Sequence, residues 1–313
     1  MAKRSYPRSG SLQYWPRKRA RKFLPSVNWN VLEGNGILGF IAYKVGMKTA
    51  LVKDLTPNSM MKDKRIFIPV TILEIPPMKI FSVRLYKNGK VMKDILLESD
   101  KEMKKILKLP KQVKQLELEK EDFDNLRVIA YSLVKRTSIK KTPDIIEIAL
   151  GGGKEEQIKF VKEHSGKEIY ASDFLQNRKL VDVRGLTTGK GLSGPVKRFG
   201  IGLKFHKSEK GQRRPGSLGP WHPARVSFHV SQAGQMGMFT RIIYNVNVVK
   251  HGKISDKNIN PKSGFKHFGN IQTEFLILRG SVQGPPKRQL LLTAPLRKTK
   301  KQEKKSFEIS KLV

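Results

Sequence analysis

Residues 182–241 read DVRGLTTGKGLSGPVKRFGIGLKFHKSEKGQRRPGSLGPWHPARVSFHVSQAGQMGMFTR, and this stretch is the most informative part of the sequence. It is rich in glycine, Lys and Arg, and Glu209 is its only acid after Asp182. A segment this long with so little apolar content is uncommon in a compact domain unless it is a functional loop. Glycine lets the backbone approach another backbone closely and leaves N–H groups open to anions. We therefore predict a long basic loop, residues 186–240, suited to threading between RNA helices.

Segments rich in β-branched and aromatic residues lie on both sides of this loop and predict strands. Two of the predictions are strand pairs, one turning at residues 45–47 and one bent at Pro76-Pro77. The predicted strands are residues 36–44 with 48–55, 66–76 with 78–87, and then 126–134, 145–150, 180–186, 225–230, 240–249 and 271–279. Many short strands around a central insertion predict a mainly β fold, a β-barrel interrupted by an α/β module.

The predicted insertion, residues 89–170, differs from the rest of the chain in its charge. It contains 15 of the 26 acids together with 18 Lys or Arg, so it is almost neutral. Ser99 and Glu102 have the spacing of a capping box before a short helix that ends near Pro110. Residues 154–164 predict a second helix, which follows the glycine loop 151–153. The predicted organisation is an N-terminal extension 1–34, a barrel 35–88 and 171–286, the insertion 89–170, and a basic tail 287–313.

The total charge restricts the classes of partner. The 313 residues include 63 Lys or Arg and 26 Asp or Glu, a formal net charge of +37. Such self-repulsion calls for a polyanion. No stretch reaches the roughly 18 apolar residues of a spanning helix, and the basic N-terminus lacks the apolar region of a signal peptide. The partner is therefore expected to be nucleic acid, not a membrane.

The chain contains no cysteine, which excludes disulfides, thiolate nucleophiles and Cys-based zinc sites. Its six histidines are not at zinc-protease spacing. Gly185–Gly191 resembles a phosphate-binding loop but is one residue short and has Gly where the magnesium-binding hydroxyl should be. No nucleophile, base and orienting group stand out together. We therefore expect no catalytic residue, no protein-bound metal, and no cofactor beyond Mg²⁺ that the RNA itself would bind.

The first 25 residues mix bases with aromatic residues and prolines. Alone they cannot bury enough apolar surface to fold, so they are expected to order on a partner. Arg and Lys would pair with phosphates, while aromatic rings can stack on unpaired bases. The alternative is a plain disordered basic tail. Trp221 also has two interpretations, a fingertip against RNA or an aromatic residue packed in the barrel.

The expected RNA contacts lie in this arm and in the loop. They are Arg4, Arg8, Tyr14, Trp15, Arg17, Lys18, Arg19 and Arg21 in the arm, and Arg184, Lys190, Lys197, Arg198, Lys204, Lys207, Arg213, Arg214, Trp221, His222 and Arg225 in or beside the loop.

Several stretches resemble a known family, that of the third protein of the large ribosomal subunit in its archaeal form. They are GFIAYKVGM, VDVRGLTTGKGLSGPVKRFG, GSLGPWHPARVSFHVSQAGQMG and YNVNVVKHG, with RSGSLQYWPRKRA near the N-terminus. The resemblance covers nearly the whole chain. It implies a six-stranded barrel of the translation-protein type with an inserted α/β lobe. It also implies a structural, non-enzymatic role in the cytoplasmic ribosome.

The resemblance further implies binding to large-subunit ribosomal RNA near its 3′ end and support of early assembly. The loop and the N-terminal extension would reach toward the peptidyl-transferase centre, with Trp221 matching the family's fingertip tryptophan. There are two departures. Glu209-Lys210-Gly211 stands where eukaryotic relatives have His-Arg-Gly, so no histidine modification is carried over. Pro220 replaces the alanine of the common Gly-Ala-Trp and would stiffen the fingertip.

Two other classes of protein remain as alternatives. A DNA-architectural protein would use the same charge and bind duplex DNA as well as RNA, although no DNA-reading motif is present. An RNA-modifying enzyme would need a cofactor fingerprint, and the sequence contains none. The expected partners are large-subunit ribosomal RNA and neighbouring ribosomal proteins, with no homo-oligomer.

Overall fold

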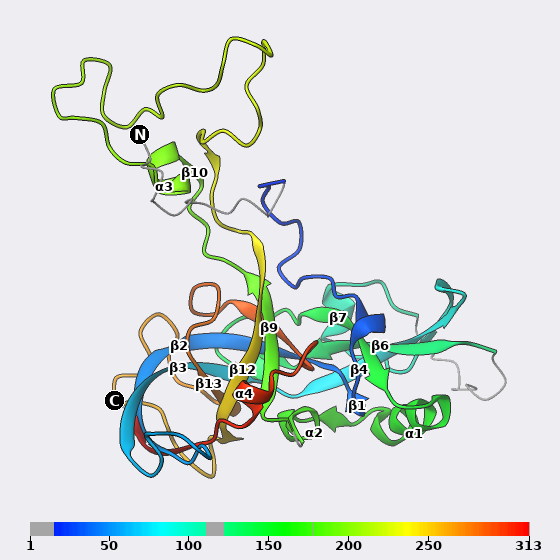
Figure 1. Cartoon of the computed structure of the whole chain (residues 1–313). Coiled ribbons are helices and arrows are strands. Elements are labelled where there is room, and N and C mark those ends of the chain that lie inside the picture. Colours follow the sequence, from blue (N-terminus) through cyan, green and yellow to red (C-terminus); the bar gives the residue numbers. More distant parts are fainter. Residues whose placement is uncertain (1–15, 111–121, 177, 313) are drawn as a thin grey trace. The chain divides into compact units, whose positions relative to one another are not determined.

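The structure is a computed structural model of the chain, and it describes residues 16–110, 122–176 and 178–312. The chain divides into two compact units. The main unit comprises Leu24–Gly185 and Arg241–Val313, and the loop unit comprises Met1–Phe23 and Leu186–Thr240. The architecture is mainly β, as predicted, with two curled sheets in the main unit (Figure 1).

The first sheet has the strand order β14-β9-β12-β13-β3-β2-β15. Its strands are β2 (Gly39–Asp54), β3 (Arg65–Ile75), β9 (Leu180–Leu186), β12 (Thr240–Lys253), β13 (Glu274–Arg279), β14 (Gln289–Thr293) and β15 (Phe307–Leu312). The sheet curls so far that β14 pairs with β9 on one side and with β2 on the other. Strands far apart in the sequence thereby become neighbours.

The long strand β2 replaces the first predicted hairpin. Its two halves both pair with β3, and the register shifts between Lys44 and Gly46. Val45, the extra residue, is fully buried. An extra residue in one strand of an antiparallel pair makes a β-bulge, which bends the strand without ending it. The predicted turn at residues 45–47 is therefore wrong, and a bulge accounts for the break in the pattern.

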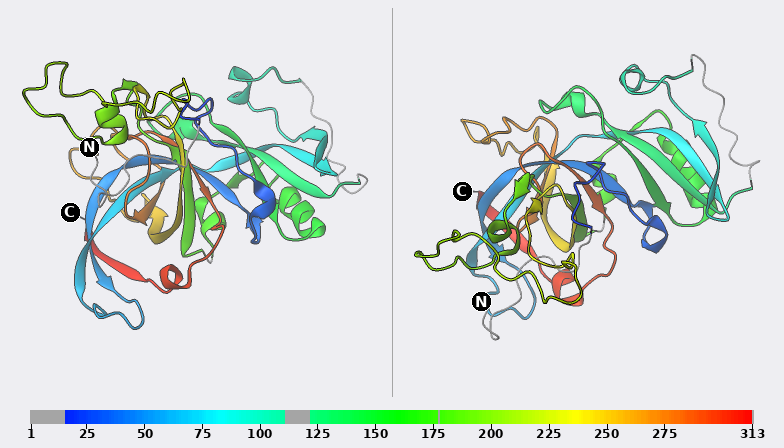
Figure 2. Two further views of the ribbon diagram at one scale, coloured as in Figure 1. Left: turned by 45° about the horizontal axis from the view of Figure 1, so that its top comes forward. Right: turned by 90° about the horizontal axis from the view of Figure 1, so that it is seen from above.

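The second sheet has the order β1-β7-β6-β4-β5, and β8 also pairs with β4. Its strands are β1 (Gly36–Ile37), β4 (Met78–Lys87), β5 (Lys90–Leu96), β6 (Asn125–Ser132), β7 (Ile145–Gly151) and β8 (Glu168–Ile169). The predicted pairing of residues 66–76 with 78–87 is wrong, because β3 and β4 belong to different sheets. Pro76 and Pro77 cannot donate ladder hydrogen bonds, and the chain changes sheets there. Figure 2 shows the two sheets side by side.

The helices of the main unit are short. The helix α1 (Lys154–His164) has the predicted bounds, and Glu156 Oε2 accepts a hydrogen bond from the Gly153 N–H at its start. The helix expected after Ser99 is a single 3-10 turn, η2 (Met103–Lys105), and the Asp100 carboxylate accepts the Glu102 N–H before it. The others are η1 (Trp29–Val31), η3 (Val134–Arg136), α2 (Ala171–Leu175) and α4 (Lys300–Glu303). None of the described helices is long and apolar enough to cross a membrane.

Two further sequence predictions need correction. Residues 225–230 form no strand: the backbone there bends and turns, and Phe228 is 66% exposed. Residues 287–313 are no simple basic tail, since they contain β14 and β15. The reason lies in Leu290, Leu291 and Leu292, which are fully buried although bases surround them in the sequence. A three-residue apolar run is too short to predict a strand, and only the pairing with β2 and β9 reveals it.

The hydrophobic core lies between the sheets. Phe40 on β2 is fully buried, pairs with Leu292 of β14, and packs at 6.0 Å between ring centroids against Phe174 of α2. A second cluster covers the opposite face of β2, β3 and β13, beneath the segment 254–271. The two clusters use alternate residues of β13: Leu276 and Leu278 belong to the first, Phe275 and Ile277 to the second. This period of two is that of a strand buried on both faces.

Tyr43 links the first sheet to the second. Its ring is fully buried, and its hydroxyl hydrogen-bonds to Ser132 Oγ at 2.8 Å and to Asp144 Oδ2 at 2.5 Å. Burial, followed by the negative charge of Asp144, raises the pKa of Tyr43 well above its ordinary value. The hydroxyl therefore stays protonated and donates to the carboxylate.

Replacing Tyr43 with Phe should lower the free energy of unfolding by about 1–3 kcal/mol, because the Asp144 carboxylate loses a buried donor. Denaturant unfolding of the full chain measures this change. Tyr244→Phe is the matched control, since the Tyr244 side chain is exposed. Equal effects of the two substitutions would contradict the linking role of Tyr43.

Candidate nucleic-acid interface

The base of the loop unit is a two-stranded ladder that brings residues 187–191 beside residues 235–239. The Thr187 N–H donates to the Phe239 carbonyl at 3.0 Å, and the Lys190 N–H donates to the Met236 carbonyl at 2.9 Å. Above it, β10 (Leu192–Ser193) pairs with β11 (Gly234–Gln235). The helix α3 (Pro195–Phe199) follows. The loop thus begins with ordered backbone, although its sequence has little apolar content.

Gly237 explains why glycine is needed in this ladder. Its φ of +78° lies in the left-handed region, and a Cβ atom built on it would lie 2.0 Å from the Thr188 carbonyl oxygen. No side chain fits at that distance. The backbone of residues 188–190 can approach only because position 237 has no side chain.

Replacing Gly237 with Ala should open the ladder. Amide hydrogen exchange at Lys190 and Met236, both donors in the ladder, should become faster, because the strands must separate to admit the methyl group. Gly202→Ala is the control, since a Cβ there meets nothing within 4 Å. Unchanged exchange in the Gly237 variant would show that the close approach does not hold the loop's base.

Arg198 links the two ends of the loop through hydrogen bonds within the loop unit. Its Nε donates to the Gln235 carbonyl at 3.1 Å, and its Nη1 donates to the carbonyls of Gln232 at 2.9 Å and Ala233 at 3.3 Å. Burial lowers the pKa of Arg198 from its ordinary value. Phe199 is buried beside it, and the Arg17 guanidinium lies 4.1 Å from the centre of the Phe199 ring. Arg198 and Arg17 are therefore partly engaged in the unit's own structure.

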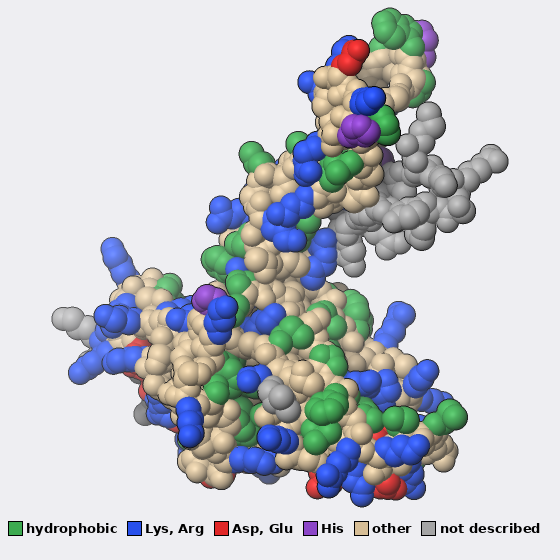
Figure 3. All heavy atoms as spheres, turned by 90° about the vertical axis from the view of Figure 1, so that its left-hand side faces the viewer, with side chains coloured by type: hydrophobic (Ala, Val, Ile, Leu, Met, Phe, Trp, Pro, Cys, Tyr) green, Lys and Arg blue, Asp and Glu red, His purple; other side chains and the backbone are tan. Residues whose placement is uncertain are grey.

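The outer part of the loop, residues 200–233, exposes both charge and apolar surface. Trp221 is 88% exposed, so within the loop unit it packs in no core. The loop 186–240 contains nine Lys or Arg and a single acid, the exposed Glu209. Its bases therefore cannot be neutralised from within the loop. Figure 3 shows Lys and Arg side chains spread along this part of the chain.

The structure places the other predicted contact residues in three groups. The exposed ones are Lys18, Arg19, Arg21, Lys190, Lys197, Lys204, Lys207, Arg213, Arg214, His222 and Arg225. Arg4, Arg8, Tyr14 and Trp15 lie outside the described residues. Arg184 is only 7% exposed, and its Nε donates to Thr293 Oγ1 at 3.1 Å inside the first sheet. Arg184 was predicted to contact RNA, but its side chain is buried in the first sheet. It therefore does not belong to the exposed surface of the loop.

Sequence reasoning missed the exposed apolar side chains of the loop. Leu203, Phe205 and Phe228 are 57%, 68% and 66% exposed. Large apolar residues are normally buried, and a group of them on one exposed segment indicates a binding surface. The signal was present in the sequence as aromatic residues scattered among bases without a strand or helix period.

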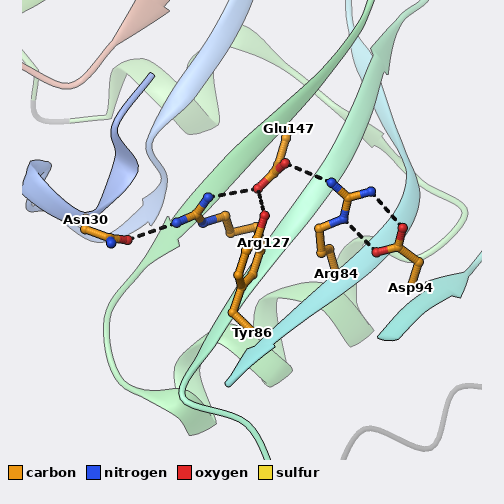
Figure 4. A network of polar contacts seen from close by, with 6 residues as sticks. All are labelled: Asn30, Arg84, Tyr86, Asp94, Arg127 and Glu147. Atoms are coloured by element: carbon orange, nitrogen blue, oxygen red, sulfur yellow. Dashed lines mark hydrogen bonds and ion pairs between the residues drawn. The ribbon is translucent and has the colours of Figure 1, made fainter. Parts of the chain in front are cut away.

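The second sheet offers a contrasting surface, in which bases are paired with acids (Figure 4). Arg84 forms two bonds of 2.7 Å with Asp94 and one of 3.1 Å with Glu147. Arg127 donates to the other oxygen of Glu147 at 2.9 Å and lies 4.2 Å from the centre of the Tyr86 ring. The hydrogen bond to Asp94 raises the pKa of Arg84 above its ordinary value. These guanidinium groups already have carboxylate partners, whereas the loop 186–240 contains Glu209 as its single acid.

Across residues 16–110, 122–176 and 178–312, no three His, Cys, Asp or Glu side chains gather in a group that could hold a metal ion. His206, His222 and His229 are spread along the exposed loop. The arrangement can neutralise phosphates and offer rings for stacking, which are the two elements of binding to single-stranded or irregular RNA.

Comparison with known proteins identifies the family of the chain. Residues 1–312 match the family described as Ribosomal protein L3. A protein named "Large ribosomal subunit protein uL3" from Methanocaldococcus jannaschii is 39% identical over 307 residues, which cover 93% of this chain and 91% of the relative. Proteins of the same name from Methanobrevibacter smithii and Picrophilus torridus are 36% and 37% identical, over 97% and 96% of this chain and 95% and 94% of the relatives. The chain therefore belongs to the ribosomal protein L3 family.

Proposed function

We propose that this chain is a structural constituent of the large ribosomal subunit that binds ribosomal RNA directly through its loop unit. One observation carries the proposal: residues 186–240 contain nine bases, eight of them exposed, and several exposed large apolar side chains, with one acid among them. Such a surface is unfavourable in water alone and complementary to RNA, which offers phosphates and unpaired bases. Membership of the L3 family supports a structural protein of the ribosome, not an enzyme.

Contacts between the loop's bases and RNA phosphates would hold the loop in position on the RNA. Half or more of protein contacts to nucleic acid go to phosphate and sugar, and these fix orientation without reading sequence. Trp221 and its neighbours would then stack on or wedge against unpaired bases. By resemblance to the family, the loop reaches toward the peptidyl-transferase centre and the chain binds near the 3′ end of the RNA, early in assembly. The catalytic chemistry there belongs to the RNA, so Trp221 has no chemical step.

The main unit serves as the anchor of this loop. The loop begins and ends in β9 and β12, two strands of the first sheet. We infer that β2, β3, β13, β12, β9 and β14 form the six-stranded barrel of the translation-protein type, an inference supported by the pairing of β14 with both β9 and β2. The second sheet, with its paired charges, would face solvent or neighbouring ribosomal proteins.

Competition binding separates this proposal from a DNA-architectural protein. The full chain, bound to large-subunit ribosomal RNA, is challenged with unlabelled RNA or with duplex DNA of equal length. We expect the RNA to compete at much lower concentration, because exposed rings need unpaired bases. We also expect affinity to fall by about 10³–10⁵ between about 50 and 200 mM salt if six to ten phosphates are contacted. Equal competition by duplex DNA would favour the architectural protein, and salt-insensitive binding would contradict the proposal.

A further inference from the structure

A short, strongly basic segment lies on the main unit, between β14 and β15. Residues 297–305 read RKTKKQEKK, in which six of the nine residues are Lys or Arg and Glu303 is the one acid. The segment contains the helix α4. Five of its bases are exposed: Arg297, Lys298, Lys300, Lys301 and Lys304. RNA binding by the loop unit leaves these charges without a role.

Side-chain amides of β12 hold the backbone of this segment in place. Asn245 Nδ2 donates to the Arg297 carbonyl at 2.7 Å and to Thr299 Oγ1 at 3.0 Å. Asn247 is buried, and its Nδ2 donates to the Gln302 carbonyl at 2.7 Å. Figure 1 shows α4 beside β12, the strand that carries both asparagines. The basic segment is therefore a fixed part of the first sheet's surroundings.

The two ends of the segment are attached to other strands. Asp182 Oδ2 of β9 accepts the Leu296 N–H at 2.9 Å, just before the first base. The Leu55 N–H, which follows β2, donates to the Ser306 carbonyl at 3.0 Å, just after the last base. A segment that is already ordered loses less conformational entropy on binding than a disordered basic tail would. Its charges are thus presented in one fixed arrangement.

The charges of the segment repel one another. Lys300 at the start of α4 and Lys304 at its C-cap are four residues apart, a spacing at which like charges destabilise a helix. Burial, followed by the charge of Arg279, lowers the pKa of Lys305, and the Asp54 carboxylate acts in the opposite direction. Within the part of the chain that the structure describes, no ion pair joins a base of this segment to an acid. A polyanion beside the segment would relieve this repulsion.

The composition of the segment indicates which polyanion fits. Residues 297–305 include no aromatic and no apolar residue, so the segment has no ring on which an unpaired base could stack. Lysine is depleted at protein–protein interfaces, which argues against a protein partner. Contact with phosphate and sugar remains. Double-stranded RNA is recognised in this way, by its shape and through its phosphates and 2′-hydroxyls.

We propose that residues 297–305 bind the sugar–phosphate backbone of a double-stranded segment of the ribosomal RNA. The inference rests on the proposed function and adds a second RNA contact, on the main unit. The two contacts differ in kind, because the loop unit offers exposed rings to unpaired bases and this segment offers only charge. Lysine ammonium groups act as point charges on phosphates, so the contact fixes orientation without reading the base sequence.

Tethered radical probing of the assembled large subunit tests the inference. The chain contains no cysteine, so one introduced cysteine carries a single iron–EDTA probe that releases hydroxyl radicals. Glu303→Cys places the probe in the segment without removing a base. We expect cleavage in two stretches of ribosomal RNA that pair with each other. Lys104→Cys, at an exposed position of the nearly neutral segment 89–170, is the control and should not cleave those two stretches.

Two results of this experiment would overturn the inference. One is cleavage confined to a single unpaired stretch of RNA, and the other is an absence of RNA cleavage because a neighbouring protein covers the segment. The proposed function would survive both results, since the labelled chain would be in the subunit. Failure of the labelled chain and of the wild-type chain to enter the subunit would instead remove the proposed function.

Charge removal gives a second, independent readout. The triple variant K300Q/K301Q/K304Q of the full chain should lower the slope of log affinity for ribosomal RNA against log salt by about two to three, because each phosphate contact contributes about 0.7–0.9. The matched control is K104Q/K105Q/K108Q, which removes three exposed lysines from the segment 89–170 and should leave the slope unchanged. If both variants lower the slope equally, net charge and not the basic segment is responsible, and the inference is wrong.

Discussion

Neutralising Lys204, Lys207, Arg213 and Arg214 together, each to Gln, should weaken binding to ribosomal RNA uniformly across RNA sequences. All four side chains are exposed on the outer loop. Each phosphate contact contributes about 0.7–0.9 to the slope of log affinity against log salt, so the slope should fall by about three to four. Filter binding of the full chain over a series of salt concentrations measures both the affinity and the slope.

The matched control removes four charges from the second sheet's surroundings. Lys101, Lys104, Lys105 and Lys108 are also exposed, and they lie in the nearly neutral segment 89–170. Their replacement by Gln should leave the slope almost unchanged, because this part of the chain is not expected to meet RNA. If both sets lower the slope equally, net charge alone governs binding, and the special role of the loop is contradicted.

Replacing Phe40 with Ala should lower the free energy of unfolding by about 3–5 kcal/mol, a large share of a domain's usual stability of about 5–15 kcal/mol. Phe40 is fully buried between β14 and α2, and truncation leaves a cavity where its ring meets Phe174. Thermal or denaturant unfolding of the full chain measures the loss.

Trp221→Ala is the informative comparison, because it removes an even larger aromatic side chain from an exposed position. It should change the free energy of unfolding by no more than about 0.5 kcal/mol. Its effect should appear instead in the function of the assembled ribosome. A loss of stability close to that of Phe40→Ala would mean that Trp221 packs in a core, the alternative that the sequence left open.

Elements with strong local patterns could be predicted from the sequence. β9 and α1 have the predicted bounds, because a short segment rich in Leu and Val and a capped helix with a glycine stop are both local signals. The long basic loop was likewise visible in its composition. These features depend on neighbours in the sequence, which a single chain displays directly.

Features that depend on distant pairing could not be predicted in this way. β14 has only three consecutive leucines among bases, and its burial comes from β2 and β9, both more than 100 residues away. The position of Arg184 beside the loop predicted an exposed base. Its side chain instead lies within the first sheet, where it donates a hydrogen bond to Thr293.

The most direct test of the central claim is sedimentation of cell lysate on a magnesium-containing gradient, followed by detection of the chain before and after a high-salt wash. The chain should travel with the large ribosomal subunit and stay there through the wash, because a loop threaded into folded RNA cannot leave by simple exchange of counterions. Travel with light fractions or with chromosomal DNA, or complete release by the wash, would contradict an RNA-embedded structural protein.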